Sequence, residues 1–307
     1  MLDQSVGVIG VGRLGSDVAF ALAEQDLCDI VLYDQEPRRA EYLATDLSDT
    51  SFGRVYNRRI RCVSRMSDLS DCDVILVAAG ARLGPDASEA TVYEKNKLII
   101  TEIADALIGS SSIIVMAGEP VDLMTSQLRH TLKVPQARVL GIGGIVDAFV
   151  ARNAIGDALD VSPDYIRTHV VGPHGGGAQL AWRYTSINGI PIDQITDPER
   201  IKTIEKHALQ SLNERLARLD QSNSRYAPAM ASIELIRSIV RDDRRILSVT
   251  VDVEECYGVS GMAMSVPCVI GRFGAERLIP PELDGAARKA IQDAAASHKK
   301  LLAGGAA

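Results

Sequence analysis

A lone histidine stands among glycines in residues 170–182, VVGPHGGGAQLAW. His174 follows a proline and precedes three consecutive glycines, and it is one of only five histidines in the chain. Because glycine weakens both helices and strands, this stretch predicts a tight loop. An imidazole titrates near neutral pH and can accept or donate a proton. Two hypotheses fit the loop: a surface turn that carries a polar side chain, or a catalytic imidazole at the mouth of a pocket.

A second candidate site is the spacing GxGxxG at residues 10–15, between an apolar β-branched run and a helical pattern. In that context Gly10 permits a tight turn, Gly12 lets a pyrophosphate approach the backbone, and Gly15 lets helix and sheet pack closely. The start of the helix adds free N–H groups and a partial positive charge. Asp34 ends the next strand pattern, where its carboxylate can accept hydrogen bonds from both ribose hydroxyls of NAD and repel the extra phosphate of NADP. NAD is therefore the predicted cofactor, and a glycine turn in a cofactor-free α/β protein is the alternative.

The elements that must position these residues alternate between strands and helices in the first half of the chain. Apolar runs predict strands at residues 5–12, 29–34, 59–64, 72–80, 111–118 and 137–144. Helical patterns are found at residues 13–26, 36–50 and 90–107. The strand runs are continuously apolar, which indicates burial on both faces. The predicted fold is an α/β Rossmann fold, a doubly wound parallel sheet.

The second half is less regular. A long helix over residues 141–159 marks the predicted border between a dinucleotide-binding domain, residues 1–143, and an α+β domain, residues 144–307. Further helices are predicted at residues 197–221, 227–243 and 282–305. Alternating apolar and polar residues predict antiparallel strands within residues 245–255 and 263–279.

The composition is that of an ordinary globular protein, with 307 residues, 46% hydrophobic and 24% charged. No apolar run reaches the roughly 20 residues that span a bilayer, and the N-terminal residues lack the basic start of a signal peptide. We therefore expect a cytoplasmic protein that does not bind membranes. Five scattered cysteines form no CxxC pair, which argues against a metal site and a disulfide framework. A net charge of −7 disfavours nonspecific nucleic-acid binding.

Several segments, in order along nearly the whole chain, resemble the lactate/malate dehydrogenase family. VGVIGVGRLGSDVAFAL resembles its cofactor loop, VAAGARLGP with the later EKN its mobile active-site loop, EPVD its NPVD, and VVGPHGGG its GEHGD. VLGIGGIVDAFVAR resembles the family segment that carries an aspartate and an arginine. The resemblance implies that His174 takes the proton of a small-molecule alcohol as hydride leaves for nicotinamide, and that Asp147 holds the imidazole. A capping or helix-face carboxylate is the alternative for Asp147.

The same resemblance implies a C-terminal domain for substrate binding and assembly, and a homodimer or homotetramer. The residues that it implies for NAD binding are Gly10, Gly12, Arg13, Leu14, Gly15, Asp34, Ala79 and Gly80.

The sequence departs from the family pattern at three substrate positions. Val150 stands where an arginine clamps the substrate carboxylate, Glu89 where a loop arginine polarises the carbonyl, and Glu119 where NPVD has its asparagine. A valine cannot replace a bidentate arginine–carboxylate pair, and the two glutamates would repel an acid. The alternatives are core packing for Val150, a solvated loop residue for Glu89, and a carboxylate paired with a basic neighbour for Glu119.

The leading hypothesis is an NAD-dependent dehydrogenase for a secondary alcohol or ketone that is not an ordinary 2-hydroxy acid. A neutral or cationic substrate such as an amino alcohol would suit the altered site. The expected substrate-binding residues are Glu119, Glu89, Val150 and Arg82. A second hypothesis is an NAD-binding regulator or subunit without activity. A third is a lactate/malate-type 2-hydroxy acid dehydrogenase with relocated arginines, for which Arg82, Arg152 and Arg183 are the candidates.

Overall fold

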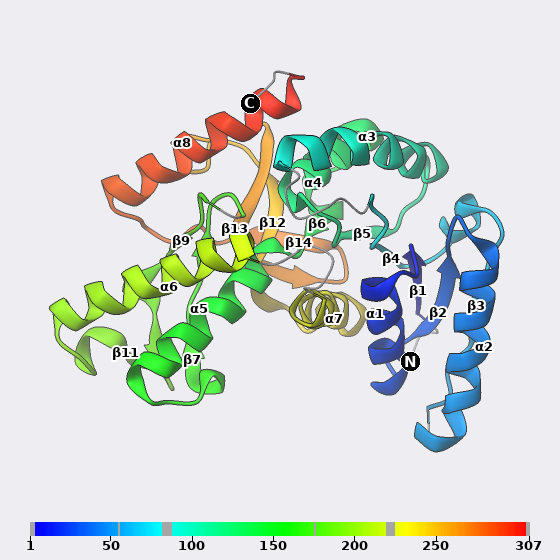
Figure 1. Cartoon of the computed structure of the whole chain (residues 1–307), viewed down its shortest axis with the longest axis horizontal. Helices are drawn as coiled ribbons and strands as arrows, with labels where there is room; N and C mark the ends of the chain where they lie inside the picture. The colour runs from blue at the N-terminus through cyan, green and yellow to red at the C-terminus, as the bar shows by residue number, and fades with distance from the viewer. Residues whose placement is uncertain (1–3, 55, 82–87, 175, 219–224, 305–307) are drawn as a thin grey trace.

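A nine-stranded sheet runs through both halves of the chain (Figure 1). The computed structural model describes residues 4–54, 56–81, 88–174, 176–218 and 225–304. The strand order is β14-β13-β12-β6-β5-β4-β1-β2-β3, and the six strands from β6 to β3 are parallel. These six are β1 Ser5–Ile9, β2 Asp29–Tyr33, β3 Ile60–Cys62, β4 Val74–Val77, β5 Ile113–Met116 and β6 Val139–Gly141. The helices between and after them are α1 Arg13–Glu24, α2 Pro37–Arg54, α3 Glu89–Ala106, α4 Val121–Leu132 and α5 Gly143–Leu159.

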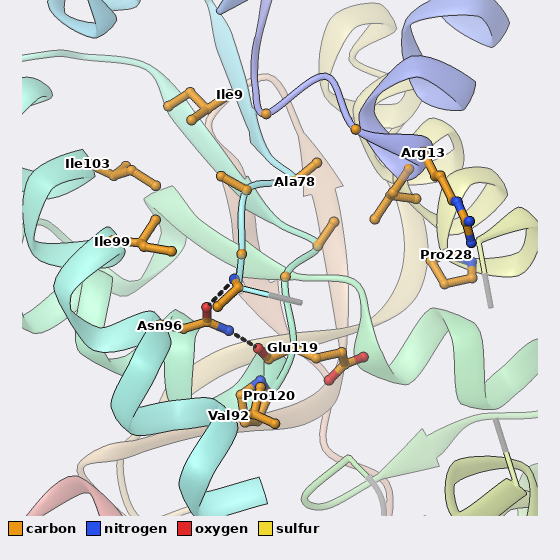
Figure 2. A pocket seen from close by; sticks show the side chains of 18 of the residues that line it. Ile9, Arg13, Ala78, Val92, Asn96, Ile99, Ile103, Glu119, Pro120 and Pro228 are labelled. Carbon is orange, nitrogen blue, oxygen red and sulfur yellow. Dashed lines mark hydrogen bonds between the residues drawn. The ribbon is translucent and has the colours of Figure 1, made fainter. Parts of the chain in front are cut away.

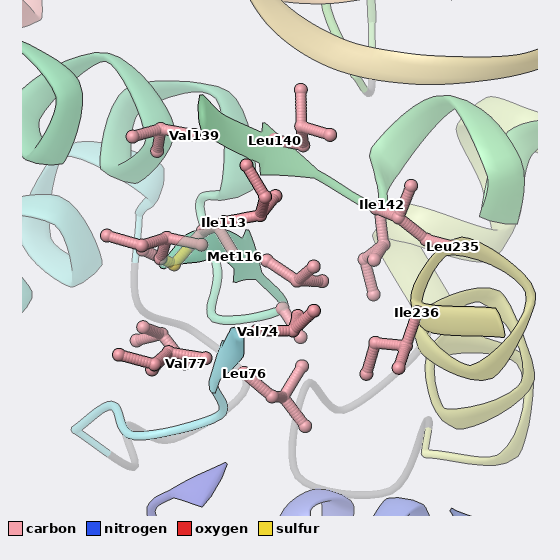
Figure 3. Close-up of a cluster of buried hydrophobic side chains, with 14 of the residues drawn as sticks. Val74, Leu76, Val77, Ile113, Met116, Val139, Leu140, Ile142, Leu235 and Ile236 are labelled. Carbon is pink, nitrogen blue, oxygen red and sulfur yellow. The ribbon is translucent and has the colours of Figure 1, made fainter. Parts of the chain in front are cut away.

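Five of the parallel strands are mostly buried, as their apolar runs predict, whereas the edge strand β3 is partly exposed. Every residue of β4 and β5 is buried. Figure 3 shows Leu76 on the side of the sheet that faces Leu235 and Ile236, which belong to a helix of the second half, α7 Tyr226–Arg241. The predicted Rossmann sheet is thereby confirmed, and its apolar core extends into the second half of the chain.

Three strands of the second half, β12 Arg245–Val253, β13 Met262–Gly271 and β14 Gly274–Leu278, pair antiparallel. The prediction of antiparallel strands here is confirmed, but they extend the sheet of the first half instead of forming one of their own. β12 joins β6 where Thr250 pairs with Gly141. A Cβ atom on Gly141 would lie 2.8 Å from Thr125 Oγ1 and 2.9 Å from Thr250 Cβ, so only glycine fits this junction.

The remaining elements surround this end of the sheet. They are β7 Ile166–Arg167, β8 Val170–Val171, β9 Gln179–Leu180, β10 Ser186–Ile187, β11 Ile190–Pro191, α6 Pro198–Arg218 and α8 Gly285–Leu302. The C-terminal helix α8 packs on α4, β9 and β13 (Figure 1). None of the helices within the described part of the chain is long and apolar enough to cross a membrane.

Candidate active site

A cavity of about 930 Å³ opens where β1, β4 and β5 end. Its wall includes the residues that follow these strands, beginning at Gly10, Ala78 and Ala117 (Figure 2). Ligands of open α/β sheets bind at this edge, beyond the carboxyl ends of the strands. Of the residues expected from the sequence, those that line the cavity are Gly10, Gly12, Arg13, Leu14, Asp34, Ala79, Gly80, Glu89, Glu119, Asp147, Val150 and His174.

The glycine turn after β1 has the shape that a dinucleotide needs. Gly10 has φ +89° and lies against the backbone of Ala79, to which a Cβ would come within 2.7 Å. Gly15 does not line the cavity, but a Cβ there would lie 2.0 Å from the Gly10 carbonyl oxygen, which holds α1 close to this turn. Gly12, the N-cap of α1, lines the cavity with Arg13 and Leu14 of the first turn, so the N-terminus of this helix lies at the cavity wall, where a pyrophosphate can bind.

Asp34, the residue after β2, also lines the cavity. Its carboxylate accepts hydrogen bonds from the backbone N–H groups of Val11 at 2.9 Å and Glu36 at 3.0 Å. The Arg39 guanidinium lies 3.5 Å away. The buried carboxylate is thus fixed at the end of β2, where it can accept from ribose hydroxyls. The residues present fit NAD.

His174 lies in the turn after β8 and lines the same cavity as Asp34. Its Nδ1 is 2.9 Å from Asp147 Oδ2 on α5, and Asp147 is buried. The backbone N–H of His174 donates to Asp122 Oδ2 at 2.7 Å. Two carboxylates from α5 and α4 therefore fix both the ring and the backbone of this histidine, so it is not a surface turn residue.

Glu119, which follows β5, faces the other ring nitrogen. Its Oε1 lies 3.6 Å from His174 Nε2, and its Oε2 accepts from the Val121 N–H at 3.0 Å. Burial lowers the pKa of His174, but the Asp147 and Glu119 carboxylates outweigh it and hold that pKa well above 6.5. Burial raises the pKa of Glu119, yet His174 brings it below its usual value. The imidazole is thus held between two carboxylates and favours its charged form.

Asn96 on α3 connects two walls of the cavity (Figure 2). Its Oδ1 accepts from the Ala81 N–H at 2.6 Å, and its Nδ2 donates to the Glu119 carbonyl oxygen at 2.8 Å. The side chain is 2% exposed. It positions the backbone after β4 against the backbone that carries Glu119.

A second histidine, His298 on α8, also lines the cavity. Its Nε2 lies 3.4 Å from Oε1 of Glu89, the first residue of α3. The sequence offered no signal for this residue, because a histidine on an amphipathic C-terminal helix is ordinary. Glu89 is 46% exposed, but it lies at the cavity wall and is paired with His298.

The comparisons with known proteins agree on one family. The model of the lactate/malate dehydrogenase NAD-binding domain matches residues 4–141, and that of the lactate/malate dehydrogenase α/β C-terminal domain matches residues 146–307. The chain belongs to the lactate/malate dehydrogenase family. It is therefore an NAD-dependent dehydrogenase that acts on CH–OH groups, and the hypothesis of an inactive NAD-binding regulator is set aside.

Relatives of this dehydrogenase cover nearly its whole length. A malate dehydrogenase of Chlorobium luteolum is 30% identical over 293 residues, 94% of each chain. The crystal structure of Cryptosporidium parvum malate dehydrogenase superposes with a TM-score of 0.91, at 22% identity and 99% coverage of both chains. The lactate dehydrogenase of the same organism, complexed with lactic acid and NAD, superposes with a TM-score of 0.90 at 22% identity, covering 99% of this chain and 98% of the other.

Three arginines, Arg82, Arg152 and Arg183, are the sequence-based candidates for a relocated substrate cation. Arg82 lies outside the described residues. Arg152 donates to the Pro163 carbonyl oxygen at 3.1 Å, and the exposed Arg183 pairs with Glu282. Among the described residues, the arginines that line the cavity are Arg13, Arg39 and Arg225. The described part of the chain also holds no group of side chains that could bind a metal ion.

Proposed function

We propose that the dehydrogenase interconverts a small secondary alcohol and its ketone, with His174 as the proton acceptor and donor. When bound, NAD supplies the hydride acceptor. In oxidation, neutral His174 takes the hydroxyl proton while Asp147 stabilises the resulting imidazolium. In reduction, the charged imidazole returns that proton to the carbonyl oxygen. The observation that carries this role is the 2.9 Å contact between His174 Nδ1 and the buried Asp147, which leaves Nε2 for the substrate.

A 2-hydroxy acid of the malate type is the first substrate candidate. It is supported by relatives that are named malate dehydrogenase, at 30% identity over 94% of this chain. Such a substrate needs a cationic partner for its carboxylate, because an unpaired carboxylate in a closed site is strongly disfavoured.

A neutral or cationic alcohol is the second candidate, favoured by one specific contact. Glu119 stands 3.6 Å from the imidazole nitrogen that must receive the substrate hydroxyl. Val150, buried in the same cavity wall, offers no charge to an acid. A carboxylate beside the reacting carbon would meet Glu119, whereas an ammonium or hydroxyl group would find an acceptor there.

The test is NAD reduction by a panel of matched alcohols: L-malate, L-lactate, propane-1,2-diol, 1-aminopropan-2-ol and propan-2-ol. Activity on any member that disappears in His174→Gln supports the proposed chemistry. Preference for the acids identifies the first substrate class, and preference for the diol or the amino alcohol identifies the second. Equal activity of His174→Gln and the unchanged protein would remove the proposed role of His174.

We also propose a homodimer or homotetramer, on the family resemblance alone, and a cytoplasmic location, because the five scattered cysteines form no CxxC pair. The particle mass from light scattering after gel filtration tests the assembly against the 33.0 kDa of one chain.

A further inference from the structure

We propose that His298 is a substrate-binding residue and that Glu89 positions it. The imidazole N–H at Nε2 is shared between Glu89 and a second oxygen of the substrate, beyond the hydroxyl that faces His174. That oxygen belongs to a carboxylate or to a neighbouring hydroxyl group. The inference rests on the proposed alcohol dehydrogenase activity and adds a residue of the C-terminal helix to its substrate site.

His298 lies close enough to His174 and Asp122 for their charges to interact. It lines the same cavity as His174, Asp147 and Glu119. Glu89, its partner, also lines the cavity and keeps 46% of its side chain exposed. The contact between them therefore lies at the cavity wall, where a substrate can reach it.

The distance between His298 and Glu89 allows the Nε2 N–H to donate to a second acceptor as well. Nε2 and Oε1 are 3.4 Å apart, longer than the 2.7–3.2 Å of a well-formed N–H···O bond. By contrast, His174 Nδ1 contacts Asp147 at 2.9 Å. An acceptor oxygen in the cavity can therefore take part of the His298 N–H without breaking a tight bond.

Packing alone does not explain a histidine at position 298. The side chain is 9% exposed, and Nδ1 is buried without a hydrogen-bond partner among the described residues. A buried polar atom without a partner destabilises a fold, and an apolar side chain would avoid that cost. A residue that lowers stability at a cavity wall is typical of a functional site.

The charges around His298 favour its protonated form. Glu89 faces it from α3, Asp122 from α4, and His174 from the turn after β8. Burial lowers the pKa of His298, but Glu89 and Asp122 outweigh both burial and the like charge of His174, so that pKa lies above 6.5. In its protonated form the imidazole is a hydrogen-bond donor with a positive charge. An acceptor oxygen of the substrate at this part of the cavity wall can receive a hydrogen bond from it.

The test compares His298→Leu and His298→Gln with the unchanged protein on the same panel of alcohols. We expect His298→Leu to raise KM for malate, lactate and propane-1,2-diol by about tenfold or more, with propan-2-ol and 1-aminopropan-2-ol unaffected. A glutamine amide can place an N–H near the position of Nε2, so His298→Gln restores part of the affinity. We expect the thermal midpoint of His298→Leu to equal or exceed that of the unchanged protein. Lys299→Gln, on the exposed face of α8, is the matched control.

A second measurement keeps the two proposals separable. Binding of oxamate, an unreactive analogue of a 2-oxo acid, and of propane-1,2-diol to the protein–NADH complex is followed by NADH fluorescence. If no alcohol is oxidised but His298→Leu weakens this binding, the proposed reaction fails and the role of His298 stands. The role of His298 would be overturned if His298→Leu lost activity equally on all five alcohols and its thermal midpoint fell as well. It would also be overturned if ligand binding to His298→Leu and to the unchanged protein were equal, or undetectable in both.

Discussion

In the proposed reaction, proton transfer depends on the imidazole of His174. Replacing it by glutamine removes the base but keeps a polar side chain of similar length. We expect kcat to fall by about 10²–10⁴-fold, the usual contribution of a positioned acid or base. NADH binding, measured by fluorescence titration, should not change. His207→Gln, on the exposed face of α6, is the control and should retain full activity.

Glu119 is, after Asp147, the second carboxylate that raises the pKa of His174. Its carboxylate raises the pKa of His174, so Glu119→Gln lowers that pKa. Alcohol oxidation needs neutral His174, and its kcat/KM rises with pH through the His174 pKa. In Glu119→Gln this rising limb moves to lower pH, which a kcat/KM profile in the oxidation direction measures. A limb at unchanged pH would contradict the coupling between these two side chains.

At the scale of elements, the glycine turn joins β1 to α1 through one close contact. A Cβ at residue 15 would lie 2.0 Å from the Gly10 carbonyl oxygen, so Gly15→Ala must push α1 away from the turn. We expect a loss of about 1–3 kcal/mol in the free energy of unfolding and weaker NADH binding. Gly53→Ala is the control, because that helical position has nothing within 4 Å of its Cβ.

In Gly53→Ala the free energy of unfolding should rise by about 0.5–1 kcal/mol, since alanine is the better helix former. Urea denaturation of both variants checks the pair. Equal changes in the free energy of unfolding for the two substitutions would show that the close contact at Gly15 does not contribute to stability.

Local patterns explain what the sequence predicted correctly. The glycine spacing at residues 10–15 and the aspartate after β2 belong to one continuous strand–turn–helix–strand segment, so backbone geometry alone brings them together. The apolar runs of β4 and β5 predict buried parallel strands for the same reason. The family resemblance added His174 and Asp147 as a pair, which lie 2.9 Å apart.

Contacts between distant segments explain what could not be predicted from the sequence. The alternation in β12 predicts a strand, but no local feature says that it joins β6 at Gly141. Likewise, Glu89 and His298 are separated by about two thirds of the chain, and their contact depends on how α8 packs on the elements around it. Only tertiary packing decides which edge a strand joins and which helix face meets a cavity.

At the scale of the whole molecule, the shared sheet couples the two halves. β12, β13 and β14 continue the sheet beyond β6, and residues of both halves line the cavity. The chain's single tryptophan, Trp182, packs in the second half, whereas the glycine turn belongs to the first. The fluorescence of Trp182 therefore reports on the folding of the second half. The glycine turn that is proposed to bind NADH belongs to the first half.

We expect Trp182 fluorescence and far-UV circular dichroism to give the same urea midpoint, because neither half keeps its sheet edge covered without the other. NADH at 100 times its Kd should raise both midpoints together, equivalent to about 2.7 kcal/mol of added stability. If the halves folded independently, Trp182 would unfold at its own midpoint and NADH would leave it unchanged. A common shift instead means that occupying the cofactor turn stabilises the helices and strands around Trp182 through the sheet that both halves complete.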